Sequence, residues 1–182
     1  MVMREIEVKA RVNNIKDLLD KASELGISFG EPTVQDDTTY ETKLSKNDPN
    51  WNIFRIRKQG NKIILTMKYT ASTRSRDNHE RETIIENAKD VSDMLERVGY
   101  TLGVRICKKR RTAKYNKLEI CLDEVDNLGS FIEVEKLADD EADVDAIQSE
   151  LWSILLELGV GQEERVHEGY DTLMYKFLEN EK

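Results

Sequence analysis

The sequence has few of the residues that bind transition metals. Two of its 182 residues are cysteines, Cys107 and Cys121, and two are histidines, His79 and His167. The cysteines lack CxxC spacing and the histidines lie far apart, so a zinc site of thiolate or imidazole ligands is not supported. A metal bound here would need oxygen ligands, which favour a hard ion such as Mg²⁺, Mn²⁺ or Ca²⁺.

Long apolar runs and an excess of positive charge are missing as well. No stretch approaches the roughly 20 apolar residues that span a bilayer, and the N-terminal MVMREIEVKA lacks a signal-peptide core. The formal net charge of −8 disfavours binding to anionic lipid or to nucleic-acid phosphates. We therefore expect a cytoplasmic protein that binds neither a membrane nor a nucleic-acid duplex.

The length suits one domain over residues 1–182, in which folding should bury roughly 70% of the unfolded surface. Only 38% of the residues are hydrophobic and 35% are charged, so the apolar residues must share one face of each element. Apolar residues recur at helical spacing in three segments, each followed by a glycine that suits a helix end. The predicted helices are residues 14–25, 90–98 and 143–158.

Between these helices the apolar and charged residues alternate with a period of two, as in strands. At least seven short strands are predicted, at residues 2–11, 54–57, 63–68, 80–84, 105–111, 118–123 and 132–135. Turn residues at 59–61, 114–117 and 127–129 indicate a mostly antiparallel sheet. Residues 43–50 and 69–78 are predicted to be polar loops.

One face of these strands is charged. Any single alternation also fits a sheet face exposed to water, and a soluble α+β domain with surface charges is the simplest alternative. If about eight strands close into a barrel with the helices outside, however, the charged face lines the interior. The candidate inward residues are Glu5, Glu7, Lys9, Arg55, Arg57, Lys68, Glu80, Glu82, Lys109, Arg111, Glu119, Asp123, Glu133 and Glu135.

Such an interior needs a ligand that satisfies both signs of charge, because an isolated charge is costly to remove from water. Arginine forks and lysines suit several linked phosphates. Clustered carboxylates instead suit Mg²⁺ or Mn²⁺, which bridges to phosphate oxygens. A polyphosphate with a bound metal ion would satisfy both the bases and the carboxylates.

The order of these motifs resembles the CYTH superfamily, the triphosphate tunnel metalloenzymes. The resemblance covers nearly the whole chain and rests on EIEVK at 5–9, FRIR at 54–57, LTMK at 65–68, ERE at 80–82, KRR at 109–111 and CLDEVDNLGSFIEVE at 121–135. Together with QDDTTY at 35–40, the last segment is most similar to the class IV adenylate cyclase branch. That branch carries a Ser-Tyr pair near its C-terminus, where this chain has Gly169-Tyr170.

The resemblance implies an α+β fold with an eight-stranded antiparallel tunnel barrel, a Mg²⁺ or Mn²⁺ cofactor, and specific site residues. The implied metal ligands are Glu5, Glu7, Asp123, Glu133 and Glu135. The implied catalytic residues are Glu5, Glu7, Lys9, Lys109 and Arg111. The implied substrate-binding residues are Lys9, Arg55, Arg57, Lys68, Glu80, Glu82, Lys109, Arg111 and Tyr170. Tyr170 either closes the tunnel mouth or packs with Leu173 in a last helix.

Several functions remain open at this point. The leading hypothesis is conversion of ATP to cyclic AMP and pyrophosphate. The main alternative is a triphosphatase acting on inorganic triphosphate (tripolyphosphate), thiamine triphosphate or a nucleoside triphosphate, and a minor one is a non-catalytic triphosphate or polyphosphate binder. Carboxylates on several strands favour an enzyme, because a pure phosphate binder needs only bases. The oligomeric state is open, and a homodimer is one option.

Overall fold

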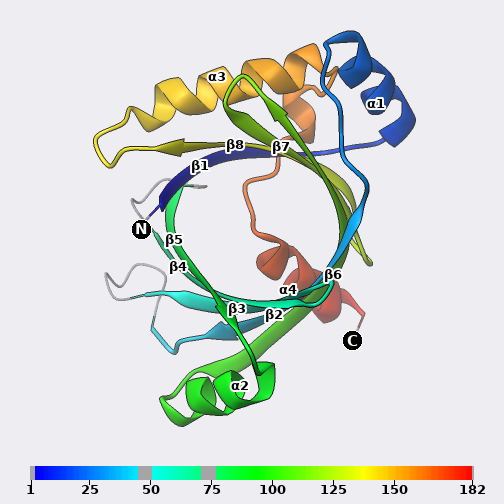
Figure 1. The fold of residues 1–182 in the computed structure, drawn as a ribbon. Coiled ribbons are helices and arrows are strands. Elements are labelled where there is room, and N and C mark those ends of the chain that lie inside the picture. The colour runs from blue at the N-terminus through cyan, green and yellow to red at the C-terminus, as the bar shows by residue number, and fades with distance from the viewer. Residues whose placement is uncertain (1–2, 45–50, 71–76, 182) are drawn as a thin grey trace.

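The computed structural model describes residues 3–44, 51–70 and 77–181, and these form a closed barrel of eight antiparallel strands in the order β1-β5-β4-β3-β2-β6-β7-β8 (Figure 1). The strands are β1 (Met3–Arg11), β2 (Thr33–Glu41), β3 (Ile53–Gln59), β4 (Lys62–Thr70), β5 (Asp77–Ile85), β6 (Thr101–Tyr115), β7 (Leu118–Val125) and β8 (Gly129–Ala138). The predicted α+β tunnel barrel is confirmed. Most of the two predicted loops, residues 45–50 and 71–76, lies outside the described residues.

Four α-helices accompany the barrel: α1 (Ile15–Glu24), α2 (Ala88–Arg97), α3 (Val144–Glu157) and α4 (Tyr170–Asn180). The three helices predicted from periodicity are present, and α4 follows them. Asn14, Asn87 and Asp143 cap the first three by accepting hydrogen bonds from backbone N–H groups of the first turn. A glycine with positive φ follows each of these helices.

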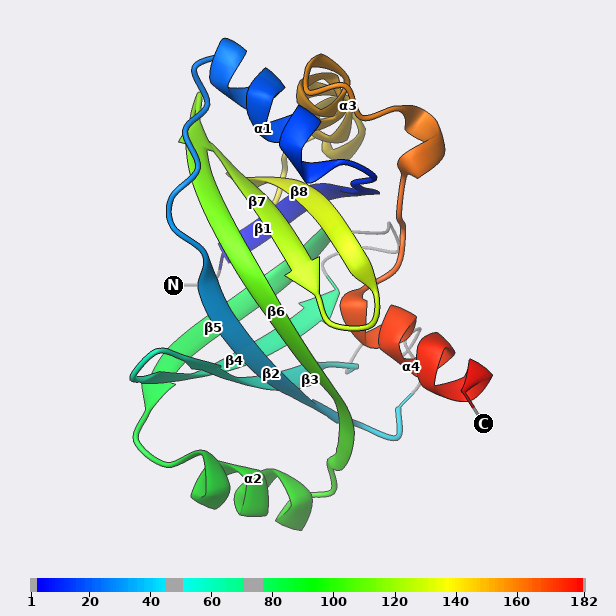
Figure 2. The ribbon, with the colours of Figure 1, turned by 90° about the vertical axis from the view of Figure 1, so that its right-hand side faces the viewer.

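The helices α1, α2 and α3 cover the outer face of the barrel (Figures 1 and 2). Leu151 and Leu155 of α3 are fully buried in one cluster with Ile6 and Val8 of β1. On the opposite side, Leu95 of α2 belongs to a second cluster that covers β2, β3 and β4. The apolar face of the strands therefore points outward, and their polar face lines the lumen.

The helix α4 is placed differently, because it lies across one end of the barrel (Figure 2). Tyr170 and Met174 are buried there with Val104 and Ile106 of β6 and Phe131 of β8. This cluster lies at the end of the lumen, so some apolar residues of β6 point inward.

Three neighbouring strands, β8, β1 and β5, each carry a Glu-x-Glu pair. In the register between β1 and β8, Glu7 is opposite Glu135 and Lys9 is opposite Glu133. In the register between β7 and β8, Glu119 is opposite Glu135. The barrel order thus gathers carboxylates from separate parts of the sequence on one wall of the lumen.

Candidate functional site: a charged lumen

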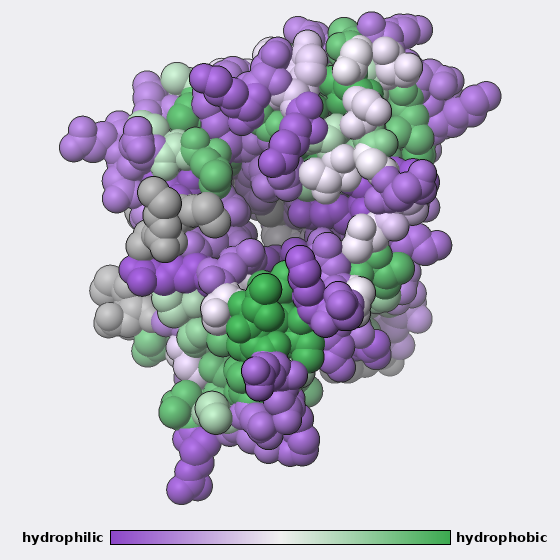
Figure 3. All heavy atoms as spheres, in the orientation of Figure 1, coloured by the Kyte–Doolittle hydropathy of each residue, from purple (hydrophilic) through white to green (hydrophobic). Residues whose placement is uncertain are grey.

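The barrel encloses a cavity of about 500 Å³. In the space-filling view, hydrophilic residues surround much of the central hollow (Figure 3). The predicted site residues that line it are Glu5, Glu7, Lys9, Arg55, Arg57, Lys68, Glu80, Glu82, Glu133, Glu135 and Tyr170. Glu119, which the strand pattern places on the inner face, lines it as well.

The structure corrects the expected orientation of two residues in β6. Lys108 and Arg110 line the cavity, whereas Lys109 is exposed and neither it nor Arg111 is among the lining residues. Lys108, Lys109, Arg110 and Arg111 are all basic, so either alternation gives a charged inner face. The apolar residues that precede these bases in β6 were expected to point outward, but Ile106 points inward under α4. Lys108 and Arg110 have the same strand parity as Ile106, so they point inward in place of Lys109 and Arg111.

The acidic wall has unusual electrostatics. Burial, followed by the charges of Glu5, Glu7 and Glu133, raises the pKa of Glu135 to about 9. Burial and the neighbouring charge of Glu80 raise the pKa of Glu5 to about 8. Within the described residues, neither Glu5 nor Glu135 forms an ion pair with a lysine or arginine. The wall is therefore short of positive charge.

This wall suits a hard divalent cation. Oxygen atoms of Glu119 and Glu135 and the sulfur of Cys121 lie within 4.8 Å of one another, and Glu5 and Glu7 line the same cavity. Carboxylates that converge on one wall of a cavity form the oxygen donor set that Mg²⁺ or Mn²⁺ prefers. Glu119 was predicted to point inward but was not among the predicted metal ligands, although it has the same strand parity as Asp123.

Two carboxylates that were expected to bind metal are instead occupied by bases. Glu133 pairs with Lys9 Nζ at 2.7 Å and with Arg110. Asp123 is fully buried, pairs with Lys108 Nζ at 3.0 Å and with Arg110, and is not among the lining residues. Burial opposes its ionisation, but the charges of Lys108 and Arg110 hold the pKa of Asp123 below its usual value. Both carboxylates position bases in this arrangement.

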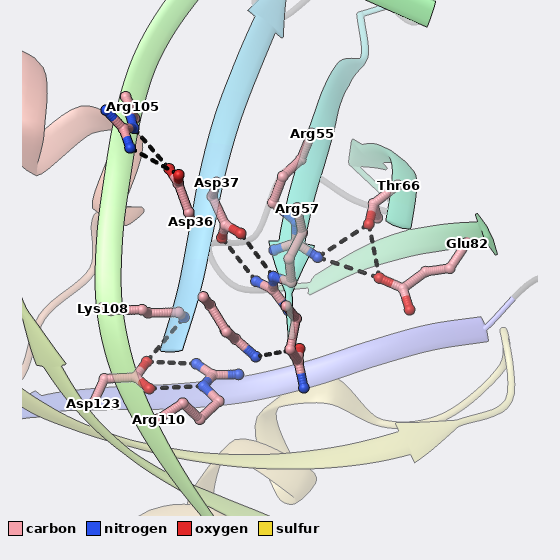
Figure 4. A network of polar contacts seen from close by, with 12 residues as sticks. Asp36, Asp37, Arg55, Arg57, Thr66, Glu82, Arg105, Lys108, Arg110 and Asp123 are labelled. Atoms are coloured by element: carbon pink, nitrogen blue, oxygen red, sulfur yellow. Dashed lines mark hydrogen bonds and ion pairs between the residues drawn. The ribbon is translucent and has the colours of Figure 1, made fainter. Parts of the chain in front are cut away.

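The basic wall faces the lumen from β3, β4 and β6. Arg57 forms a two-point ion pair with Asp37, from Nε to Oδ1 at 2.7 Å and from Nη2 to Oδ2 at 2.8 Å (Figure 4). Burial opposes ionisation of Asp37, but the hydrogen bonds from Arg57 and the charge of Arg55 keep its pKa low. Asp37 lies in the QDDTTY segment and was not among the predicted site residues.

Arg55 and Lys68 complete this wall. Arg55 Nη2 donates to Thr66 at 3.2 Å and to Glu82 at 3.3 Å, while its buried Nε has no hydrogen-bond partner among the described residues (Figure 4). Lys68 Nζ lies 2.5 Å from Glu80. Burial opposes ionisation of Glu80, but the charges of Lys68 and Arg55 lower its pKa to about 2. A ligand with several anionic oxygens would find donors along this wall.

Tyr170 lies at the end of the lumen where α4 begins. Its hydroxyl donates to Asp123 at 2.9 Å, and Lys9 Nζ lies 3.5 Å from its ring centroid. Gly169, Asp171 and Thr172 also line the cavity, and in the described chain no side chain caps the first turn of α4. The two sequence-based alternatives for Tyr170 are thus combined: it contacts the lumen and packs in the last helix with Leu173.

The fold and the two-walled lumen define a triphosphate tunnel protein. A family model for the CYTH domain matches residues 3–170, and the chain belongs to this family. Members are adenylate cyclase-like or triphosphatase enzymes that use divalent metals. None of the helices in the described residues is long and apolar enough to cross a membrane.

Comparison with individual proteins agrees with this assignment. A protein of Methanocaldococcus jannaschii named "Putative adenylate cyclase MJ0240" is 24% identical over 172 residues, which are 92% of this chain and 97% of that protein. The PH1012 protein of Pyrococcus horikoshii has the same fold, with a TM-score of 0.79, 25% identity, and coverage of 93% of this chain and 98% of its own. An adenylyl cyclase-like protein of Hippeastrum, described as having a dominant triphosphatase activity, has a TM-score of 0.60 and 16% identity, with coverage of 92% of this chain and 91% of its own.

Proposed function

We propose that this protein is a metal-dependent enzyme that binds ATP in the lumen and converts it to cyclic AMP and pyrophosphate. The observation that supports this proposal is the pair of opposed walls. Carboxylates of β1, β7 and β8 face bases of β3 and β4 across one cavity, and the bases of β6 lie beside β7. A chain of phosphates with a bound cation satisfies both walls at once.

In this proposal each wall has its own task. Arg55, Arg57 and Lys68 bind the phosphate oxygens, and Lys108 and Arg110 extend the same wall towards α4. Glu5, Glu7, Glu119 and Glu135 would hold Mg²⁺ or Mn²⁺. When bound, such an ion would supply positive charge beside the phosphates and would stabilise the charge that develops during phosphoryl transfer.

The cyclase reaction also needs a nucleophile in line with the bond that breaks. The 3′ hydroxyl of the ribose forms a bond to the α-phosphorus, the bond between that phosphorus and the pyrophosphate oxygen breaks, and the hydroxyl proton is released. The bases of the lumen hold the pyrophosphate while it departs, and donors that are already in position stabilise this charge more effectively than water does. Lys9 and Arg110, both fixed by Glu133, are such donors.

A triphosphatase is the second candidate. The same walls would then hold the phosphates while water, in place of the ribose hydroxyl, attacks the terminal phosphorus. The Hippeastrum protein, which shares this fold, is described as dominantly a triphosphatase, so the fold is compatible with that chemistry. The two reactions differ in the nucleophile and in the products.

Product identification tests the proposal. The purified protein is incubated with ATP, tripolyphosphate or thiamine triphosphate in Mg²⁺, in Mn²⁺ and in excess EDTA, and the products are separated by chromatography. We expect cyclic AMP and pyrophosphate from ATP, and no turnover in EDTA. Release of inorganic phosphate would instead support the triphosphatase. Tight binding without any product would support a binder, and activity in EDTA would contradict the metal requirement.

A further inference from the structure

Within the described residues, the shortest strand pairing of the barrel is the one between β1 and β5. Residues 3–6 of β1 pair with residues 77–80 of β5, which gives four residue pairs, whereas every other pairing in the described chain has at least six. On one side of this β1–β5 seam lie β1, β8 and β7, and on the other lie β5, β4 and β3. The seam therefore joins the strands of the acidic wall to strands that carry the basic wall.

Glu5 points into the lumen from this seam. It lines the cavity, and in the backbone register it is opposite Asn78 of β5 and Leu137 of β8. Burial raises its pKa most, and across the seam the charge of Glu80 raises it further whereas that of Lys68 lowers it. The position of β1 relative to β5 thus sets the distance between a metal held by Glu5 and phosphates held by Lys68.

On the outer side of the seam, a buried ion pair joins the two strands. Arg4 Nε lies 2.8 Å from Asp77 Oδ1, and Arg4 Nη2 donates to Asp77 Oδ2 at 3.1 Å. Arg4 is 8% exposed and Asp77 is fully buried. Such a pair is often no more stabilising than well-packed apolar residues of the same volume, because both charges lose their water. Stability alone therefore does not explain it.

Arg4 also holds the end of β8. Its Nη1 donates to the backbone oxygens of Asp139, at 3.0 Å, and of Asp140, which follow β8 directly. His79 of β5 contacts the same segment, with Nε2 3.5 Å from Asp140 Oδ1. One guanidinium thus fixes β1, β5 and the end of β8 relative to one another. These are the three strands whose Glu-x-Glu pairs line the lumen.

We propose that Arg4 is a positioning residue for the metal, and that from outside the barrel it fixes the spacing between Glu5 and the carboxylates of β5 and β8. A metal site needs its ligands placed to within roughly 0.5 Å. Arg4 is not among the lining residues in the described chain, so its effect on the metal is carried by the backbone. This inference rests on the proposed function, because it assumes that Glu5 holds the metal.

The test separates positioning from stability. Arg4→Met leaves Asp77 as a buried charge without this partner and should lower the melting temperature. The double variant Arg4→Met with Asp77→Leu removes both charges and should recover most of that loss. Calorimetry then titrates each metal-free protein with Mn²⁺ alone, at one pH and salt concentration and well below every melting temperature.

We expect both variants to bind Mn²⁺ about ten- to a hundredfold more weakly than the parent, as is typical when a group that orients metal ligands is lost. Arg4→Lys should recover only part of the affinity, because lysine restores the charge but not the fork. A purely structural pair would instead let stability and Mn²⁺ affinity recover together in the double variant.

The matched control is Arg105→Met with Asp36→Leu. Arg105 and Asp36 form the same two-point pair, at 2.7 and 2.8 Å, between β6 and β2 and away from the seam, so Mn²⁺ affinity should not change. If the double variant of the seam binds Mn²⁺ as tightly as the parent, or if the control loses as much, the inference is wrong although the proposed function stands. If the parent binds no Mn²⁺, both fail together. If it binds Mn²⁺ but makes no cyclic AMP from ATP, only the proposed reaction fails.

Discussion

Individual charges in the lumen are held by partners of opposite sign, and Arg57 with Asp37 is the clearest case. Arg57 directs Nε and Nη2 at Asp37, a geometry that a phosphate can also use. The carboxylate fixes the guanidinium in the lumen before any ligand arrives. Such preorganisation lowers the entropy cost of binding.

Replacement of Arg57 should therefore affect binding and stability separately. Arg57→Ala should reduce tripolyphosphate affinity by about ten- to a hundredfold, since a charge-assisted hydrogen bond is worth roughly 1.5 to 3 kcal/mol. It should also destabilise the protein by about 3 to 5 kcal/mol, because Asp37 would be left as a buried charge without its main partner. Calorimetric titration and denaturant unfolding measure the two effects.

The control for this prediction is the double variant Asp37→Asn with Arg57→Ala. It removes the buried charge and should recover most of the lost stability without recovering the affinity. Arg57→Lys should recover only part of the affinity, because lysine restores the charge but not the fork. Unchanged affinity in Arg57→Ala would remove this arginine from the phosphate site.

Glu7 supplies the matching prediction for the acidic wall. It lies opposite Glu135 in the register of β1 and β8 and is almost fully buried. Glu7→Gln keeps the shape of the side chain but removes one negative charge from the proposed metal ligands, so turnover should fall by at least a hundredfold while the melting temperature of the metal-free protein does not fall. Activity assays across a Mg²⁺ and Mn²⁺ series, with thermal melts, check this. Full activity would contradict the metal assignment.

At the scale of the element, strand parity decides which side chains reach the lumen. The residues predicted to point inward from β1, β3, β4, β5 and β8 line the lumen. In β1, β3, β5 and β8 they are charged residues two positions apart, which share one face of a strand. The pattern failed in β6, where four consecutive bases match either parity. It also missed β2 as a strand, because Gln35, Asp37 and Thr39 inside and Asp36 and Thr38 outside are all polar.

The alternation of residues along β6 contains no information about where α4 lies. Periodicity within a strand cannot reveal that a helix more than 60 residues later covers one end of the barrel, and this contact turns Val104 and Ile106 inward. The pairing of Asp123 with Lys108 and Arg110 follows from the same register. Long-range packing therefore determined which residues were misassigned.

The register of β6 gives a paired prediction. Lys109→Ala should leave triphosphate affinity within about twofold of the parent, because Lys109 is exposed. Lys108→Ala should reduce it by about tenfold, as expected for the loss of one charge-assisted contact. The two lysines are adjacent and chemically identical, so titration of both variants with tripolyphosphate isolates the effect of side-chain direction. Equal losses in the two variants would contradict the register.

The whole molecule carries an imbalance of charge that its ligands are expected to relieve. The basic wall is largely neutralised by carboxylates within the barrel. On the acidic wall, burial and then the charges of neighbouring carboxylates raise the pKa values of Glu5 and Glu135. The formal net charge of −8 adds to this excess. Folding without a metal therefore brings together carboxylates that repel one another, and stability should depend on their protonation.

The direction of that dependence follows from the two raised pKa values. Glu5 and Glu135 ionise near pH 4.5 when unfolded, but their pKa values are about 8 and about 9 when folded. Between these limits the folded protein binds more protons than the unfolded chain, so its stability falls as the pH rises. Glu80, with a pKa lowered to about 2, acts in the opposite direction only below pH 4.5. Lys108, with a pKa lowered to about 8, also makes stability rise with pH, but only above pH 8.

We therefore expect the melting temperature of the metal-free protein to fall between pH 5 and pH 8. The free energy of unfolding should fall by an amount on the order of a few kcal/mol. Each kcal/mol corresponds to a change in melting temperature of about 2 to 4 °C for a chain of this size. Mg²⁺ or Mn²⁺ should raise the melting temperature more at pH 8 than at pH 5, because the ion competes with protons for the same carboxylates. Glu135→Gln, which removes one of these carboxylates, should flatten the pH dependence and weaken the effect of the metal. Calorimetric scans of the parent protein and of Glu135→Gln, in EDTA and in excess metal at both pH values, measure these changes in melting temperature. A metal-free melting temperature that stays constant or rises from pH 5 to pH 8 would contradict this account of the acidic wall.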